Sequence, residues 1–141
     1  MNFACGVVHA PVAVPLDLAA FFYDRSPFTA RASPSWAYID DYLWYVLLWL
    51  DVYNWRGVAR DLDDAAGTME LMMQWGMDPT CGGVQWMYPD VDPRKNAITT
   101  LEAVQASEQL AVALAKHSPR RAAPHRARAL ALWQFFDSVG L

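Results

Sequence analysis

Glycine and proline residues divide this chain into stretches long enough for helices, and this division restricts the fold more than any other feature. Between these residues we predict four long helices, over residues 34–53, 59–75, 97–117 and from beyond Pro124. The last stretch carries Leu132, Phe135, Phe136 and Val139 at the spacing of one helix face. The chain is therefore predicted to be all-α.

Local signals predict where these helices begin and end. Ser33 followed by Pro34 is typical of an N-cap and first helical position, and Gly57 predicts a turn. The segment from Pro119 to Pro124 predicts a break, and Gly140 a C-cap. A further short helix is expected over residues 14–24.

Residues 76–96 are predicted to form one long loop, because they include six Gly and Pro residues: Gly76, Pro79, Gly82, Gly83, Pro89 and Pro93. Long loops inside compact domains are often functional. This one carries Trp86 and Tyr88, which are aromatic side chains of the kind that bind ligands. We therefore expect the loop to fold toward the candidate site described below.

Composition excludes several classes of protein. The chain has 141 residues, of which 55% are hydrophobic, so it can bury the core of one domain. A net charge of −4 does not favour a nucleic-acid partner. The longest apolar run, residues 42–50, is far shorter than the roughly 20 residues of a membrane span, and the N-terminus lacks the basic start of a signal peptide. Cys5 and Cys81 could pair, although a free buried thiol is the expected state of each.

The adjacent carboxylates Asp40 and Asp41 are the strongest candidates for chemistry. Their predicted helical neighbours are apolar or aromatic: Trp36, Ala37, Tyr38, Leu43, Trp44 and Tyr45. Burial of a carboxylate is costly, and two neighbouring carboxyls do not both ionise easily, so one pKa rises. A glycosidase needs one ionised and one protonated carboxyl. The alternative is that the pair caps a helix or faces solvent, and spacing alone does not decide between the two.

Other segments carry weaker signals, each with a structural alternative. Gly82 and Gly83 precede Trp86 and would let backbone approach a ligand, or they form a tight turn. Lys95 could bind a sugar hydroxyl or face water, and Asn96 is a natural N-cap. The three histidines have no metal-ligand spacing, and we expect neither a metal nor a cofactor.

Taken in order, these segments resemble glycoside hydrolase family 76, the endo-acting α-1,6-mannanases. Residues 38–44 (YIDDYLW) resemble its Tyr-Tyr-Asp-Asp-x-x-Trp segment, and residues 81–86 (CGGVQW) its Cys-Gly-Gly-Gly-Ile-Trp segment. Residues 95–98 (KNAI) match its Lys-Asn-Ala-Ile, and residues 133–141 are similar to its Trp-x-x-Phe-x-x-x-Gly-Leu helix end. Val58, Asp61, Val84 and Met87 depart from the family's pattern.

The resemblance implies an (α/α)6 toroid and retaining hydrolysis of α-1,6-linked mannan. It implies that Asp40 is the nucleophile and Asp41 the general acid/base. It implies substrate contacts from Trp36, Tyr38, Trp44, Gly82, Gly83, Trp86, Lys95 and Asn96. The expected organisation is a segment of unclear role over residues 1–30 and a partial helical domain over residues 31–141, because four or five helices cannot close a ring of six hairpins.

Three further expectations follow from the resemblance. The protein is expected to be secreted or associated with the cell wall. The short chain is expected to be a poor enzyme and to self-associate through apolar helix faces that further helices would cover. The alternative function is a non-catalytic carbohydrate-binding or remnant domain, and another enzyme of the same toroid, such as a sugar epimerase, is disfavoured because the histidines are poorly placed.

Overall fold

The computed structural model describes residues 38–87 and 94–139. Within these ranges the regular structure is helical, as the sequence predicts, and strand pairing is limited to isolated bridges. The four helices are α2 (Ile39–Arg56), α3 (Ala59–Gly76), α4 (Ala97–Ala115) and α5 (Pro119–Val139). None of these helices is long and apolar enough to cross a membrane. The short helix expected over residues 14–24 lies outside the described residues.

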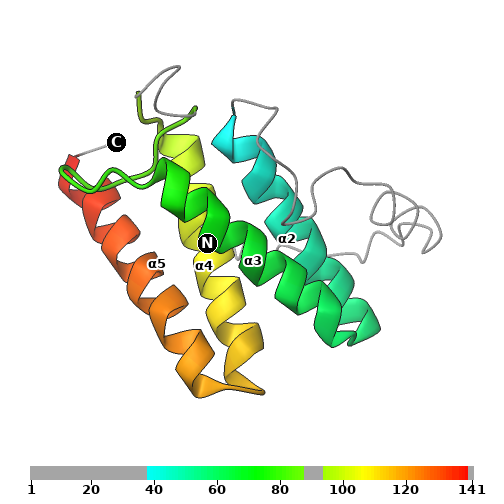
Figure 1. The fold of residues 1–141 in the computed structure, drawn as a ribbon. Coiled ribbons are helices and arrows are strands. Elements are labelled where there is room, and N and C mark those ends of the chain that lie inside the picture. The colour runs from blue at the N-terminus through cyan, green and yellow to red at the C-terminus, as the bar shows by residue number, and fades with distance from the viewer. Residues whose placement is uncertain (1–37, 88–93, 140–141) are drawn as a thin grey trace, which may run out of the picture.

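Consecutive helices run in opposite directions, so α2 and α4 begin at the same end of the molecule (Figure 1). The segment that joins α3 to α4 lies at this end, next to the end of α5 (Figure 1). Helix α4 packs against each of the other three helices. The first turns of α2 and α4 and the α3–α4 segment are therefore brought together.

The core lies around α4, whose small side chains let its neighbours approach closely. Ala103, Ala106 and Ala113 are buried on α4. The larger core residues come from α2 and α3 and include Trp49 and Met69, both at most 1% exposed. The Ala-rich sequence predicts a helix between two layers, and the central position of α4 agrees with this.

Helix α2 begins later than the sequence predicts. Tyr38 is extended, with φ of −100° and ψ of 123°, and it forms an antiparallel bridge with Met87. The predicted start at Ser33-Pro34 lies outside the described residues, but Tyr38 shows that the helix carrying the aspartates begins at Ile39. Helical spacing therefore does not define the neighbours of the pair on its N-terminal side. Gly57 ends α2 in the left-handed conformation, as predicted for the turn.

Helix α5 also differs from the prediction, because it begins at Pro119 and continues through Pro124. A proline lacks the N–H that would bond to the carbonyl four residues earlier, so it normally interrupts a helix. Here the lost bond lies in the second turn, while Ala122 and His125 are buried on either side of the proline. An ion pair of 2.7 Å between Arg121 and Asp63 also holds this turn against α3. Tertiary packing outweighs the local cost of the proline.

Candidate functional site

Asp40 lies in the first turn of α2 and both of its carboxylate oxygens accept hydrogen bonds. The indole N–H of Trp86 donates to Oδ2 at 3.0 Å, and the backbone N–H of Asp41 donates to Oδ1 at 3.1 Å. The backbone N–H of Ile39 donates to the carbonyl of Trp86 at 2.9 Å. These contacts confirm that the α3–α4 segment folds toward the aspartate pair.

Backbone pairing within the α3–α4 segment places Trp86 at the pair. Met77 bridges to Val84, and Gln85 bridges to Lys95. The backbone N–H of Trp86 donates to the carbonyl of Arg94 at 2.8 Å. Trp86 is thus bonded to α2 through its indole N–H and to the residues just before α4 through its backbone N–H, which fixes its position outside any helix or strand.

The two aspartates have different environments. The two N–H donors on Asp40 stabilise a negative charge there. Asp41 is exposed, but partial burial of its carboxyl raises the pKa, and the neighbouring charge of Asp40 raises it further. The buried Tyr42 beside them has a raised pKa for the same two kinds of reason, burial and the charge of Asp41. The pair therefore combines a carboxylate that accepts two N–H groups with a neighbouring carboxyl whose pKa is raised.

Glu102 is a third carboxyl at this site and was missed by the sequence reasoning. It is 6% exposed, and both carboxylate oxygens are buried without a hydrogen-bond partner. Burial, followed by the charges of Asp40 and then Asp41, raises its pKa to about 7. The only local signal was an acidic residue between Leu101 and Ala103 in a helix of small apolar residues. Its closeness to the pair depends on the packing of α4 against α2.

Lys95 is engaged in an ion pair within the α3–α4 segment. Its ammonium lies 2.7 Å from Oδ2 of Asp78 and 5.3 Å from the centre of the Phe135 ring. The Asp78 carboxylate also accepts hydrogen bonds from the backbone N–H groups of Thr80 and Cys81. The hydrogen bond from Lys95, followed by these two backbone bonds, lowers the pKa of Asp78 to about 2. The cation expected to contact a sugar therefore has a structural partner that closes the turn.

The two glycines of this segment pack against α5. Gly82 and Gly83 have φ of +74° and +76°, a region that favours glycine. A Cβ atom on Gly83 would lie 2.7 Å from Cζ of Phe135 and would overlap other atoms of the ring. The structure thus gives these glycines a packing role. The neighbouring Cys81 is a free thiol and is exposed, contrary to the expected burial, because it lies in the tight turn around Asp78.

The remaining predicted contact residues are distributed as follows. Tyr38 lies with its ring centre 5.2 Å from that of Trp86 and is 38% exposed. Trp44, one helical turn beyond the aspartates, is 59% exposed. The side chain of Asn96 accepts the backbone N–H of Thr99 at 2.7 Å and caps α4, as the sequence predicts. Trp36 lies outside the described residues.

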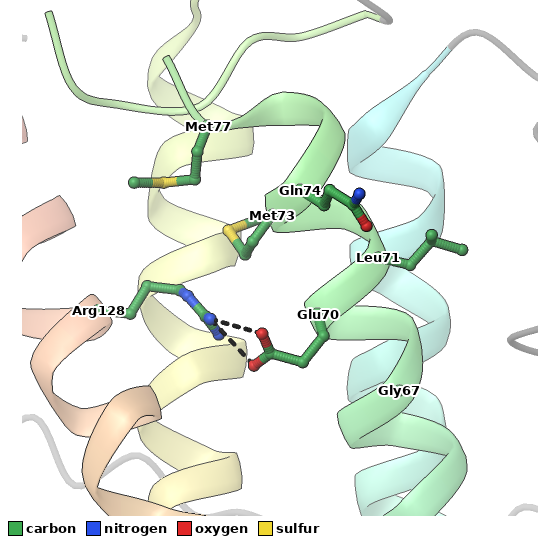
Figure 2. Close-up of a pocket in the computed structure, with 7 residues that line it drawn as sticks. All are labelled: Gly67, Glu70, Leu71, Met73, Gln74, Met77 and Arg128. Atoms are coloured by element: carbon green, nitrogen blue, oxygen red, sulfur yellow. Dashed lines mark hydrogen bonds and ion pairs between the residues drawn. The ribbon is translucent and has the colours of Figure 1, made fainter. Parts of the chain in front are cut away.

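Three grooves in the part of the chain that the structure describes are lined by residues other than the aspartate pair. One, of about 610 Å³, lies between α3 and α5 and is lined by Met73, Met77 and the Glu70–Arg128 ion pair, among others (Figure 2). The paired side chains point toward one another across this groove (Figure 2), with Arg128 Nη2 2.9 Å from Glu70 Oε1. Residues 38–87 and 94–139 contain no group of three or more His, Cys, Asp or Glu side chains suited to a metal ion.

Known proteins provide no assignment for this arrangement. Comparison of the chain with protein-family models, with curated proteins and with solved structures found no match. The geometry around Asp40, Asp41, Trp86 and Glu102 is therefore the basis for the functional conclusion.

Proposed function

We propose that this chain carries the catalytic pair of a retaining glycoside hydrolase that acts on α-1,6-linked mannan. In this proposal the Asp40 carboxylate attacks the anomeric carbon and forms a glycosyl ester as the glycosidic bond breaks. Asp41 gives its proton to the leaving oxygen and then accepts a proton from the water that cleaves the ester. The protein is proposed to act outside the cell or at the cell wall.

The observation that carries this proposal is the different environment of the two neighbouring carboxyls. Trp86 and a backbone N–H stabilise negative charge on Asp40, as a nucleophile requires. Partial burial and the charge of Asp40 raise the pKa of Asp41, which is the direction that a general acid requires. Adjacent residues on one helix turn keep their carboxyls too close for a water between nucleophile and sugar, which favours retention.

The arrangement of the helices is compatible with the proposed toroid. The α2–α3 and α4–α5 hairpins place the N-termini of α2 and α4 at the same end of the molecule (Figure 1). The aspartates lie in the first turn of α2, at this end. An (α/α)6 ring repeats such a hairpin six times, so a closed cleft would need further hairpins. An open cleft is wet, which weakens the electrostatic effects on both carboxyls. We therefore propose that the isolated chain is a weak enzyme and that a longer parent protein is active.

Hydrolysis assays on the chain and on its longer parent test the proposal. The substrates are an α-1,6-linked manno-oligosaccharide and an aryl α-mannoside whose leaving group needs no proton. Asp40→Asn should abolish turnover of both. Asp41→Asn should lower oligosaccharide hydrolysis by about 10²–10⁴-fold but preserve the first release of the activated aryl group. NMR of the first sugar product should show the α-anomer.

The matched control is Asp51→Asn, which removes an exposed carboxyl from the same helix away from the site and should leave turnover unchanged. Trp86→Phe keeps the ring but removes the donor to Asp40, and should lower turnover without abolishing it. Activity that survives both aspartate substitutions, or a β-anomeric first product, would refute the mechanism. Strong activity of the 141-residue chain alone would refute the requirement for further hairpins.

A non-catalytic role in carbohydrate binding is favoured by one observation, the exposed aromatic side chains beside the aspartates. Trp44 and Tyr38 are both exposed and flank the start of α2. Aromatic faces bind sugar rings by stacking. This alternative predicts that the chain binds mannan with unchanged affinity in Asp40→Asn and Asp41→Asn, and that Trp44→Ala weakens binding, as calorimetric titration would measure.

A further inference from the structure

Helices α4 and α5 each carry a stripe of accessible side chains, two apolar and one charged. The α4 stripe is Leu101, Val104 and Glu108, and the α5 stripe is Arg126, Leu130 and Trp133. Spacings of three and four residues keep each stripe on one face of its helix. A groove of about 320 Å³ between the two helices is lined by all of these residues except Leu101, and by Ala129.

The two stripes stand level with each other along the hairpin. Helix α4 ends at Ala115 and α5 begins at Pro119, so His117 is the middle of the turn between two antiparallel helices (Figure 1). Helices rise equally per residue, so residues equally far from His117 lie at about the same height. Three pairs meet this condition: Glu108 and Arg126 at nine residues, Val104 and Leu130 at thirteen, and Leu101 and Trp133 at sixteen.

The two charged residues of the stripes have opposite signs, and both are exposed. Within residues 38–87 and 94–139 neither Glu108 nor Arg126 forms an ion pair, although both line the same groove. Arg121 and Arg128, on the same helix as Arg126, differ in that they pair with carboxylates of α3. An acid and a base on opposite sides of one groove are therefore both open to charges on another molecule.

We propose that this face binds a second copy of the chain in a dimer with two-fold symmetry. An axis that runs along the groove, between α4 and α5, places α4 of the second copy over α5 of the first. Rotation about this axis preserves height, so each stripe meets the other stripe of its partner. The contacts, each formed twice, are Arg126 with the partner's Glu108, Leu130 with the partner's Val104, and Trp133 with the partner's Leu101.

The distribution of charge favours a second copy as the occupant. A two-fold interface brings the same surface of both subunits together, so this surface must be complementary to itself. An acid and a base at the same height on the two sides of an apolar groove satisfy this condition, whereas a face of one sign would repel its own copy. The Trp133 ring stacks on Phe136 with 5.8 Å between ring centres, so little of its freedom is left to lose on binding. The dimer does not depend on the proposed function.

Sedimentation equilibrium of the full chain measures the dissociation constant of this dimer. Glu108→Arg places two arginines opposite each other at two points of the interface, and Arg126→Glu does the same with two glutamates. Each variant should weaken the dimer by about ten- to hundredfold at low salt. The loss should shrink at about 1 M salt, because salt screens exposed charges.

A mixture of the two single variants is the decisive measurement. In a dimer with one copy of each variant, both charged contacts again join opposite signs. The mixture should therefore recover an affinity close to that of the wild type, although neither variant dimerises well alone. The double variant Glu108→Arg, Arg126→Glu should recover it in the same way, because exchange of both charges restores both pairs.

Arg120→Glu is the matched control, because it makes the same change of charge at an exposed residue of α5 that does not line the groove. It should leave the dissociation constant within about threefold of the wild type, the range for exposed charges. A chain that stays monomeric at all concentrations leaves the face to another occupant, such as helices of a longer protein, and would overturn the proposal. A dimer that both charge variants leave intact, or a mixture that recovers no affinity, would overturn it as well.

Discussion

Replacement of Gly83 by alanine tests how the α3–α4 segment is held in place. Gly83 has φ of +76°, and an added Cβ would overlap the ring of Phe135, with 2.7 Å to Cζ. The left-handed conformation costs alanine about 1–2 kcal/mol. Displacement of a packed ring costs about 1–3 kcal/mol more. We therefore expect Gly83→Ala to lower the free energy of unfolding by about 2–5 kcal/mol.

Gly57→Ala is the matched control for the backbone contribution. Gly57 has a similar φ of +68°, but nothing lies within 4 Å of the position of its added Cβ. This variant should lose only about 1–2 kcal/mol. The difference between the two variants isolates the contact with Phe135. Urea unfolding monitored by the fluorescence of the Trp residues measures both values.

A third variant, Phe135→Leu, removes the outer ring atoms that an added Cβ on Gly83 would meet. In this background Gly83→Ala should cost no more than Gly57→Ala, so that the double mutant loses less stability than the sum of the two single mutants. Equal losses at Gly57 and Gly83 in the wild-type background would refute the packing of this turn against α5. Because Trp86 follows three residues later, Gly83→Ala should also weaken the Trp86–Asp40 hydrogen bond.

Three further predictions concern stability and association. The free energy of unfolding of the wild type should fall by up to about 3 kcal/mol as pH rises from 4.5 to 7. Glu102 ionises near its ordinary pKa of 4.5 in the unfolded chain, but only at about 7 in the folded chain. Urea unfolding across this pH range should show that Glu102→Gln removes the loss. Arg128→Met should lower the free energy of unfolding by about 1 kcal/mol, because its two hydrogen bonds to the Glu70 carboxylate are partly shielded from water. Arg60→Met breaks the exposed pair with Asp64, one helical turn away, and should cost under about 0.5 kcal/mol. Equal losses in thermal unfolding would contradict this. Trp133 and Leu130 are 50% and 57% exposed on α5, and exposed apolar side chains favour association. Sedimentation should therefore detect self-association of the chain, and the double variant Trp133→Ser, Leu130→Ser should reduce it. A monomer at all concentrations would contradict the prediction.

Local sequence was sufficient for most of the helical architecture. The predicted helices over residues 59–75 and 97–117 agree with α3 and α4 to within two residues, because their boundaries depend on local signals such as the Asn96 cap. The prediction was wrong at Pro124 for the opposite reason. A proline is unfavourable in a helix locally, and only burial of the residues beside it and an ion pair to α3 keep α5 continuous.

The candidate site divides in the same way. Sequence alone singled out Asp40 and Asp41, because two adjacent acids in an aromatic stretch are visible as a pattern, and it indicated that the segment carrying Trp86 would fold toward them. Only the tertiary structure decided that the indole donates to Asp40 and that Lys95 pairs with Asp78. It also brought Glu102, 61 residues after Asp41 in the sequence, close enough to the pair for their charges to raise its pKa. A hydrogen bond or a shift in pKa depends on distance in space and on the exclusion of water, and these arise only when α4 packs against α2.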